Sequence, residues 1–579
     1  MKFCFSFLTL LLVLCASEVT TLALDREAFS FTNYDLSVQV EPEQHRLGVR
    51  GKITLRNNTP TPQTIAVLQI ASSLDWRAIK AGDKTLQIAR QPFTSDIDHT
   101  GGLSEAIVTL PQPVAPKGTI ELEVAYEGVI LLDATRLTRI GTPGDVAERT
   151  DWDQIGPGFA AVRGVGYVAW YPIATEAANL SEGDSLFEIL SRWKTREAAS
   201  RMHLHITVSS DDGQQPPVVI ANQASCQVMY EQAGRPSLAS ADCTYEPMGS
   251  VSPLFVIARY GFVDRPAIAV YNLVTHAAAA ERYADAEQKL VPLISEWFGA
   301  PHEKAHTCDL AIPNGMPYES GSLLLTPLVG TDSQSAGLAA AHQLTHAAFS
   351  SFRPWIEEGL AHFAQALYLE RERGRPTAID YMGLHRFALG EGKEPTPMPR
   401  SEDEVNRSLV NTTSEELYRS KAMYIWWMLR DMIGESALKK AIAAYRPEQD
   451  KEPSYMPRLI ASQTERDLGW FFDDWVYRDR GLPDFKVESA FSRKTMTGSY
   501  MLTITLDNLG TAGAEVPIMI KFAGGEMMKR LEVRAKNKAV IRVETPSSAP
   551  QEIVVNDGSV PESDRTNNTF KIAAGDVAK

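Results

Sequence analysis

The stretch His342-Gln343-Leu344-Thr345-His346, followed by Glu358, decides how the middle of this chain is interpreted. Residues four apart lie on one face of a helix, so His342 and His346 can present two imidazole nitrogens to one ion. The flanking alanines favour a helix. Two histidines and a glutamate leave a fourth position open for water, which is typical of catalytic zinc. The pattern predicts a zinc site at His342, His346 and Glu358, and a chance pair of histidines is the alternative.

The connection to Glu358 predicts two consecutive helices. The first is expected to end near Ser350 and Ser351, and Pro354 suits the first turn of the next one. Glu358 then lies in the opening turns of that second helix. The sequence therefore places the predicted ligands on two helices joined by a short connection.

Gln343 occupies the position at which an H-E-x-x-H site carries its glutamate base. A carboxamide does not accept a proton at neutral pH, and loss of a general base typically costs about 100- to 10,000-fold in rate. Glu357 points away from Glu358 on the helix, so it is a poor replacement. We therefore expect zinc binding to survive better than hydrolysis.

Four segments in order carry a family resemblance: Gly315-Met316-Pro317-Tyr318-Glu319-Ser320-Gly321, Trp355-Ile356-Glu357-Glu358-Gly359-Leu360-Ala361, Tyr418-Arg419-Ser420-Lys421-Ala422-Met423, and Trp475-Val476-Tyr477 with Gly481-Leu482-Pro483. They resemble the G-A-M-E-N, W-L-N-E-G-F-A, Y-x-K-G-A and W-V…G-x-P patterns of the membrane alanyl aminopeptidase family, a branch of the gluzincin zinc metallopeptidases. The ordered set is more specific than any one motif.

The resemblance implies roles for individual residues. It makes Glu358 the third zinc ligand beside His342 and His346. It places Glu319 on the free amine of the substrate, in a loop that also contains Gly315 and Met316.

The resemblance also implies that Tyr418 stabilises the tetrahedral intermediate. Tyr424 is an alternative, although a core tyrosine is its simpler interpretation. Three features depart from the family: Gln343, the short connection of residues 347–357, and the spacing of Tyr418 from Lys421.

Hydrophobic periodicity predicts a multidomain α+β protein. Alternation in Tyr34–Val40, Gly51–Arg56 and Thr119–Val124 indicates an antiparallel β domain at residues 24–260. A helical pattern over Ala277–Phe298 and short strands near Cys308–Pro313 and Ser322–Thr326 open a thermolysin-like α/β metallopeptidase domain with a helical extension, residues 261–482. Short strands at residues 483–579 suggest an Ig-like β-sandwich.

The first 23 residues have the pattern of a signal peptide, with Lys2, an apolar run, and small residues before Leu24. We therefore expect an exported protein: periplasmic, cell-surface or secreted. Lipid anchoring at Cys15 is the minority alternative, because Leu14 is bulky for a lipobox. No later segment is apolar for long enough to span a membrane. Export permits disulfides, so Cys226 and Cys243 are the natural pair, and Cys308 is expected to be buried and inert.

Charge and composition limit the partners. The 579 residues carry a net charge of −15 without a long basic run, which argues against nucleic acid. The acidic stretch from Asp557 to Asp564 suggests a surface turn, with calcium as the less favoured alternative.

The leading hypothesis is an exported zinc metallopeptidase-like protein of the aminopeptidase type that hydrolyses or binds peptide N-termini, with activity reduced by Gln343. The rival is a non-catalytic pseudopeptidase that acts as a peptide-binding or scaffold protein, and a structural surface protein without metal is the third alternative.

Overall fold

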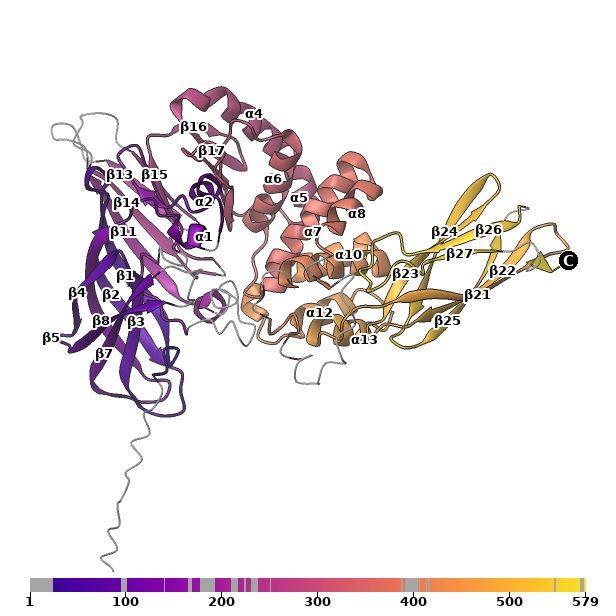
Figure 1. Cartoon of the computed structure of the whole chain (residues 1–579), viewed down its shortest axis with the longest axis horizontal. Helices are drawn as coiled ribbons and strands as arrows, with labels where there is room; N and C mark the ends of the chain where they lie inside the picture. Colours follow the sequence, from indigo (N-terminus) through magenta and orange to yellow (C-terminus); the bar gives the residue numbers. More distant parts are fainter. Residues whose placement is uncertain are drawn as a thin grey trace, which may run out of the picture.

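The computed structural model is elongated, with β-sheets at both ends and helices between them (Figure 1). The described residues are 24–94, 102–139, 141–164, 169–176, 193–209, 217–222, 225–230, 238–249, 251–386, 389–390, 405, 407–412, 414, 417–545, 548–572 and 577–578. The predicted signal peptide and Cys15 lie outside these residues. The multidomain α+β arrangement expected from the sequence is present at this coarse level.

The largest N-terminal sheet has eight strands in the order β13-β14-β11-β1-β2-β8-β4-β5. Their bounds are β1 (Phe29–Glu41), β2 (Arg46–Asn57), β4 (Leu74–Ala81), β5 (Lys84–Thr85), β8 (Thr119–Val129), β11 (Arg201–Ser209), β13 (Ser225–Tyr230) and β14 (Leu238–Tyr245). The alternation predicted for β1 is confirmed, because Leu36, Val38 and Val40 are buried while the residues between them are exposed.

The prediction of a purely antiparallel domain is wrong at one pair of strands. β1 is antiparallel to β2 but runs parallel to β11. A parallel neighbour needs a long crossover connection, and the chain between β1 and β11 supplies one. Periodicity alone reports which face of a strand is buried, not the direction of its neighbour.

Two smaller sheets complete the N-terminal part. One has the order β3-β7-β6 and the other the order β12-β15-β10-β9. Their bounds are β3 (Gln63–Ala71), β6 (Ile88–Thr94), β7 (Gly102–Val114), β9 (Gln154–Ile155), β10 (Phe159–Val162), β12 (Val218–Ala221) and β15 (Phe255–Ala258), with short helices η1 (Pro42–Gln44), α1 (Thr135–Arg139) and α2 (Gly144–Thr150). Trp76, Trp152 and Trp170 are fully buried in this part.

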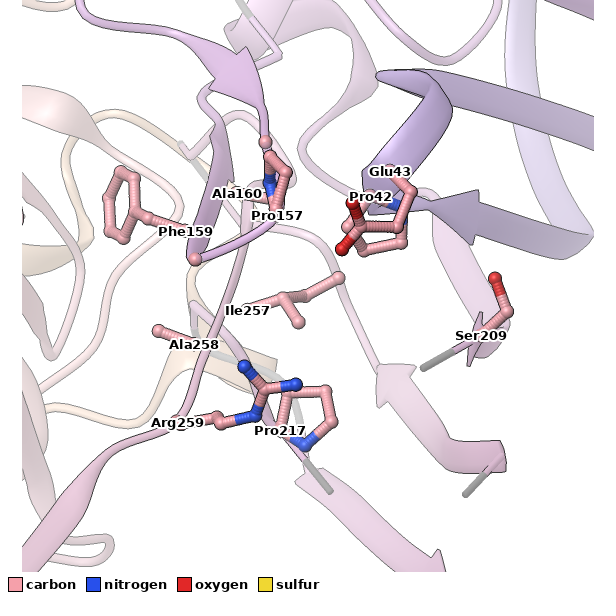
Figure 2. Close-up of a pocket in the computed structure, with 12 residues that line it drawn as sticks. Pro42, Glu43, Pro157, Phe159, Ala160, Ser209, Pro217, Ile257, Ala258 and Arg259 are labelled. Carbon is pink, nitrogen blue, oxygen red and sulfur yellow. The ribbon is translucent and has the colours of Figure 1, made fainter. Parts of the chain in front are cut away.

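A pocket open to solvent lies where η1 approaches β10 and β15 (Figure 2). Its apolar lining includes Pro42, Phe159 and Ile257, and Glu43 and Arg259 are its charged residues. None of the described residues that line it is a histidine or cysteine. The pocket therefore offers no set of metal ligands like the one predicted in the middle of the chain.

The middle of the molecule is built on a five-stranded sheet of order β16-β17-β18-β20-β19. Its elements are β16 (Gly261–Asp264), β17 (Ile268–Asn272), β18 (Ala305–Asp309), β19 (Tyr318–Ser320), β20 (Leu323–Thr326), η4 (Val274–His276), α4 (Ala277–Gln288), α5 (Val291–Phe298), α6 (Ser333–Ala348) and α7 (Pro354–Arg373). The helix predicted over Ala277–Phe298 is two helices, because Pro292 starts a new first turn and has no N–H to continue α4.

The two helices that carry the predicted ligands have well-defined starts. Asp332 accepts hydrogen bonds from the backbone N–H groups of Gln334 and Ser335, which caps α6. α7 begins at Pro354, as the sequence predicts. Each predicted ligand therefore has a fixed position along its helix.

Gly359 lets α7 pack closely on α10 (Ala422–Ile433). A Cβ at Gly359 would lie 2.5 Å from Cβ of Ala422 and 2.9 Å from Nε1 of Trp426. Both distances are shorter than real Cβ contacts, so any side chain would push the helices apart. Close packing of α7 on α10 thus explains why a glycine follows Glu358.

The helical extension packs around buried aromatic residues. It contains α8 (Arg375–Gly383), η6 (Leu417–Lys421), α10, α11 (Glu435–Ala444), η7 (Pro447–Gln449), α12 (Tyr455–Ala461), α13 (Gly469–Phe472) and η8 (Asp473–Tyr477). Trp426, Trp427, Phe471 and Trp475 are fully buried, so they belong to the core. Burial of one such side chain stabilises the fold by roughly 1.5–3 kcal/mol.

Two four-stranded sheets form the C-terminal part, in the orders β25-β22-β21-β28 and β24-β23-β26-β27. Their bounds are β21 (Phe485–Lys494), β22 (Tyr500–Asn508), β23 (Ala514–Phe522), β24 (Gly525–Val533), β25 (Lys538–Thr545), β26 (Pro550–Val555), β27 (Thr569–Lys571) and β28 (Val577–Ala578). Asp431 of α10 joins this part to the helices, because it pairs with Arg530 of β24 at 3.1 Å and with Arg375 of α8 at 2.6 Å.

The acidic C-terminal turn uses its carboxylates within the protein. Asp557 pairs with Nε of Arg375 at 3.2 Å. The buried Glu562 accepts a hydrogen bond from the side chain of Asn556. Asp564 accepts from the backbone N–H of Thr566 at 2.8 Å. These contacts account for the acidic residues as parts of the turn, and calcium binding stays an untested alternative.

The cysteines are arranged as the sequence predicts. Cys226 of β13 and Cys243 of β14 are directly opposite one another and form a disulfide. Cys308 is a buried free cysteine in β18. In the part of the chain that the structure describes, no helix is long and apolar enough to span a membrane.

Candidate metal centre

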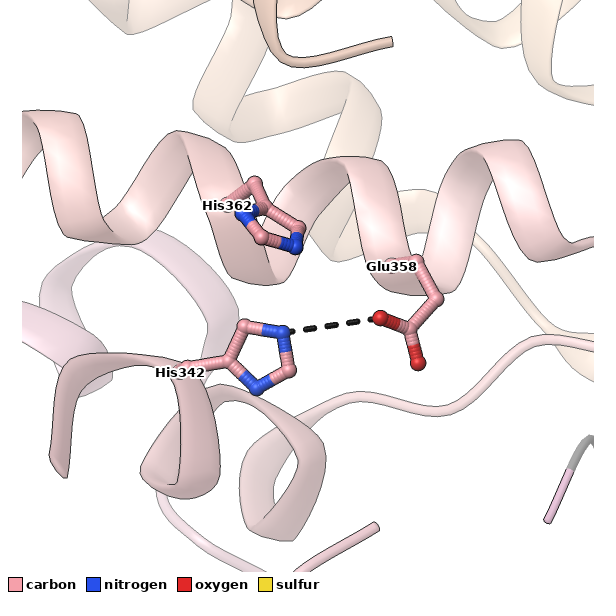
Figure 3. A group of neighbouring side chains, drawn as sticks. All are labelled: His342, Glu358 and His362. Carbon is pink, nitrogen blue, oxygen red and sulfur yellow. Dashed lines mark ion pairs between the residues drawn. The ribbon is translucent and has the colours of Figure 1, made fainter. Parts of the chain in front are cut away.

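His342, Glu358 and His362 converge between α6 and α7 (Figure 3). One ligand atom from each residue lies within 4.8 Å of the others. Nε2 of His342 is 3.5 Å from Oε2 of Glu358. His342 comes from α6, whereas Glu358 and His362 lie one turn apart on α7. Imidazole nitrogens and a carboxylate oxygen are the ligands that zinc binds.

His346 lies beside this group. Its Nε2 is 3.7 Å from Oε1 of Glu358, and its ring centroid is 4.8 Å from that of His342. Among the described residues, neither ring nitrogen of His346 has a hydrogen-bond partner, although both are buried. A buried polar atom without a partner costs about 1–3 kcal/mol, and a bound metal would satisfy one of these nitrogens. His342 and Glu358 thus belong to a group of residue types that fits a zinc ion, and His346 lies next to it. Ligation by His346 stays a prediction.

Glu319 of β19 orients the ring of His342. A carboxylate oxygen of Glu319 lies 2.6 Å from Nδ1 of His342. This contact favours the proton on Nδ1 and leaves Nε2 facing Glu358. Such a carboxylate–histidine pair is common behind metal-binding histidines. The sequence predicted that Glu319 contacts a substrate amine, a role that stays a prediction.

Burial and charge act in opposite directions on the two predicted histidine ligands. Burial alone would lower the pKa of His342, but Glu319 and then Glu358 raise that pKa to about 9. At His346, burial outweighs the opposing effect of Glu358 and lowers the pKa to about 4. Without a metal, the cluster therefore holds a proton on His342, which a cation has to displace.

Glu358 is held in its ionised form. Burial would raise the pKa of its carboxyl, but Arg419 and His342 hold that pKa well below the usual range. Nε of Arg419 lies 3.1 Å from Oε2 of Glu358. The carboxylate is therefore available to a metal at neutral pH, with one oxygen shared with Arg419.

Tyr418, the residue before Arg419, also lies in this region. Tyr418 is part of η6 and is buried, and the contact of Arg419 with Glu358 places this segment beside the candidate ligands. The hydroxyl's role in catalysis stays a prediction. Tyr424 is fully buried in α10, as expected for a core tyrosine.

The side chain of Gln343 is bonded to the central sheet. Its amide donates to the backbone carbonyl oxygen of His306 and, at 2.7 Å, to that of Ser322. Its oxygen accepts from Oγ1 of Thr307 at 3.2 Å. Both amide hydrogens are used, so the carboxamide joins α6 to the start of β18 and β20. The residue at the general-base position thus has a structural role in the observed arrangement.

A buried carboxyl group lies behind this contact. A carboxyl oxygen of Glu287 in α4 lies 3.4 Å from Oγ1 of Thr307, the hydroxyl that donates to Gln343. Burial raises the pKa of Glu287 to about 8. Glu287 is 1% exposed, so its carboxyl is expected to be protonated at neutral pH.

The loop that contains Gly315 and Met316 contacts the N-terminal part. The backbone N–H of Met316 donates to the carbonyl oxygen of Arg149, and its own carbonyl accepts from Nε1 of Trp152. Met316 is 53% exposed. These contacts fix the loop's backbone, and its predicted substrate-binding role stays untested.

His362 is the functional candidate that the sequence reasoning missed. Its spacing from Glu358 repeats the spacing between His342 and His346, so a second ligand pair on one helix face was detectable. The family resemblance directed attention to Glu358 alone. The position of α7 against α6 is what brings His362 to His342, with 4.9 Å between ring centroids.

Comparisons with known proteins find similarity at the level of structure. No protein-family model matches the sequence, and a search of curated proteins likewise gives no match. The structure is similar to a crystal structure of a mutant M1 zinc metallopeptidase from Deinococcus radiodurans, with a TM-score of 0.48 and 15% sequence identity. The alignment covers 79% of this chain and 96% of that one. At this level of similarity, statements about chemistry depend on the residues of the chain itself.

Proposed function

We propose that this chain is an exported, zinc-binding protein with a peptidase-like metal site of the aminopeptidase type. The observation that carries the proposal is the convergence of His342, His346 and Glu358 from two helices, with both nitrogens of His346 lacking a hydrogen-bond partner among the described residues. The four sequence segments that resemble the membrane alanyl aminopeptidase family support it, because three of them lie at or beside this site.

The residues around the proposed metal site would have separate roles. A bound zinc would lower the pKa of a coordinated water and polarise a peptide carbonyl. Glu319 orients His342, and Arg419 holds the carboxylate of Glu358. The carboxamide of Gln343 does not accept a proton, and it is bonded to the central sheet. We therefore propose peptides as ligands or slowly hydrolysed substrates.

A non-catalytic, peptide-binding protein is the second candidate. The observation that favours it is the use of both amide hydrogens of Gln343 by backbone carbonyl oxygens. A carboxylate in this position would meet the same oxygens, so the local structure suits an amide. The two candidates share the metal site and differ in turnover.

Metal analysis and a peptide panel test the proposal. We expect zinc to bind to the wild type and to be lost in His342→Ala. Fluorogenic aminoacyl substrates and internally quenched peptides then measure turnover, with His342→Ala as the control. Hydrolysis that is lost in His342→Ala supports the peptidase. Zinc binding and peptide binding without turnover support the second candidate, and absence of zinc from the wild type refutes both.

A further inference from the structure

His362 has the position of an additional metal ligand, an inference that rests on the proposed zinc site. It lies one helical turn after Glu358 on α7, and its ring is directed toward the space between Glu358 and His342 (Figure 3). One ligand atom each from His342, Glu358 and His362 lies within 4.8 Å of the others. The predicted zinc motif contains no residue at this position.

The ring of His362 lacks the partners that an ordinary buried histidine has. Its Nδ1 is buried and makes no hydrogen bond within the described part of the chain. Its ring neighbours are His342, at 4.9 Å between centroids, and His385, at 5.7 Å. In contrast, Nδ1 of His385 contacts the hydroxyl of Ser420 at 3.1 Å. His362 is thus placed among imidazoles without a hydrogen bond at Nδ1.

The spacing of the other ligand atoms leaves room for a four-ligand site. Zinc–ligand distances of about 2.1 Å in a tetrahedron place neighbouring ligand atoms about 3.4 Å apart. Nε2 of His342 lies 3.5 Å from Oε2 of Glu358, and Nε2 of His346 lies 3.7 Å from the other carboxylate oxygen, Oε1. Each imidazole is thus close to that spacing from one oxygen of Glu358. His362 approaches the same two residues, His342 and Glu358, from the next turn of α7.

We propose that His362 is a fourth protein ligand, so that three imidazoles and one carboxylate surround a single zinc ion. Four protein ligands are typical of structural zinc, whereas catalytic sites keep one position for water. The metal would then fasten α6 to α7. A filled coordination sphere leaves no position for a coordinated water, so this inference favours the second, non-catalytic candidate.

Cobalt and zinc binding by the purified chain test this proposal. Co²⁺ in place of zinc reports coordination number through its visible absorption, which is intense for four-coordinate sites. We expect an intense four-coordinate spectrum for the wild type, a weaker and shifted spectrum for His362→Ala, and a fall of at least 10-fold in zinc affinity. His385→Ala is the matched control, because it removes a neighbouring ring that is not in the ligand group, and it should leave the spectrum unchanged.

The outcomes separate this proposal from the proposed function. An unchanged spectrum and zinc affinity in His362→Ala overturn the role of His362 but leave a three-ligand site. Failure of the wild type to bind either metal overturns the site as a whole. X-ray absorption of the zinc-loaded wild type needs no variant: scattering from three imidazoles supports the proposal, and scattering from two contradicts it.

Discussion

Glu319 and His342 form a carboxylate–imidazole pair, with 2.6 Å between an oxygen of Glu319 and Nδ1 of His342. The contact joins β19 to α6 and points the other ring nitrogen at Glu358. A residue expected to hold a substrate amine thus contacts a metal-ligand candidate. Glu319 therefore orients the ring of His342.

Glu319→Ala should weaken zinc binding by about 10- to 100-fold, the usual effect of losing the partner of a metal-binding histidine. Competition with a chromophoric chelator measures the affinity. Glu319→Gln keeps an oxygen that accepts from Nδ1 and should recover part of the loss. Equal affinity of the wild type and Glu319→Ala would show that the pair does not support the metal.

Gln343→Glu should destabilise the fold and should not confer peptidase activity. The new carboxylate would face the backbone carbonyl oxygens of His306 and Ser322. An uncompensated buried charge costs about 3–5 kcal/mol, which thermal unfolding would detect. Gln334→Glu, the same change at the half-buried start of α6, is the control, because its side-chain oxygen already faces a cation, Arg373, at 2.6 Å. A stable Gln343→Glu variant with new hydrolytic activity would contradict the structural role of Gln343.

Glu287 should make stability fall as the pH rises. Its pKa is about 8 in the folded chain, against an ordinary value of 4.5. Between these values the folded state binds more protons than the unfolded state, so the free energy of unfolding falls by at most about 1.4 kcal/mol per pH unit. The contribution is complete below pH 4.5 and is lost as the pH approaches 8.

Glu287→Gln should remove this dependence, because an amide does not titrate. Denaturant unfolding of both proteins at pH 5, 6.5 and 8 gives the difference in stability. Glu281→Gln, an exposed change on the same helix, should leave the pH dependence as in the wild type. A parallel pH profile for the wild type and Glu287→Gln would mean that Glu287 is already ionised in the folded protein.

Cys308 should react with a thiol reagent only after the chain unfolds. Cys308 is fully buried, and Cys226 is bonded to Cys243. A thiol reagent should therefore leave Cys308 unmodified in the folded chain and modify it after unfolding. Peptide mapping without reduction should recover Cys226 linked to Cys243. Rapid modification of Cys308 in the folded protein would refute its burial.

Local signals in the sequence predict the helices and strands better than their arrangement. Pro354 marks the start of α7, and alternation in Leu36 to Val40 identifies the buried face of β1. The parallel pairing of β1 with β11 was not predictable from periodicity, because it depends on a long crossover. Spacing along one helix also pairs His342 with His346, as the structure does.

Contacts between distant segments explain what the sequence did not reveal about the site. The role of Gln343 depends on carbonyl oxygens in β18 and before β20, which have no side-chain signature in the sequence. The spacing of His362 from Glu358 was visible in the sequence, but its approach to His342 depends on how α7 lies against α6. The sequence alone predicts that Gln343 is a poor base, because it is an amide. The structure adds that this amide donates to two backbone carbonyl oxygens.

Zinc content after equilibrium dialysis tests the central claim most directly. The purified wild type is dialysed against zinc and then against metal-free buffer, beside His342→Ala as the control. The account predicts that the wild type retains one zinc ion per chain and that His342→Ala retains little. Equal and low zinc in both proteins would contradict a metal site at His342, His346 and Glu358.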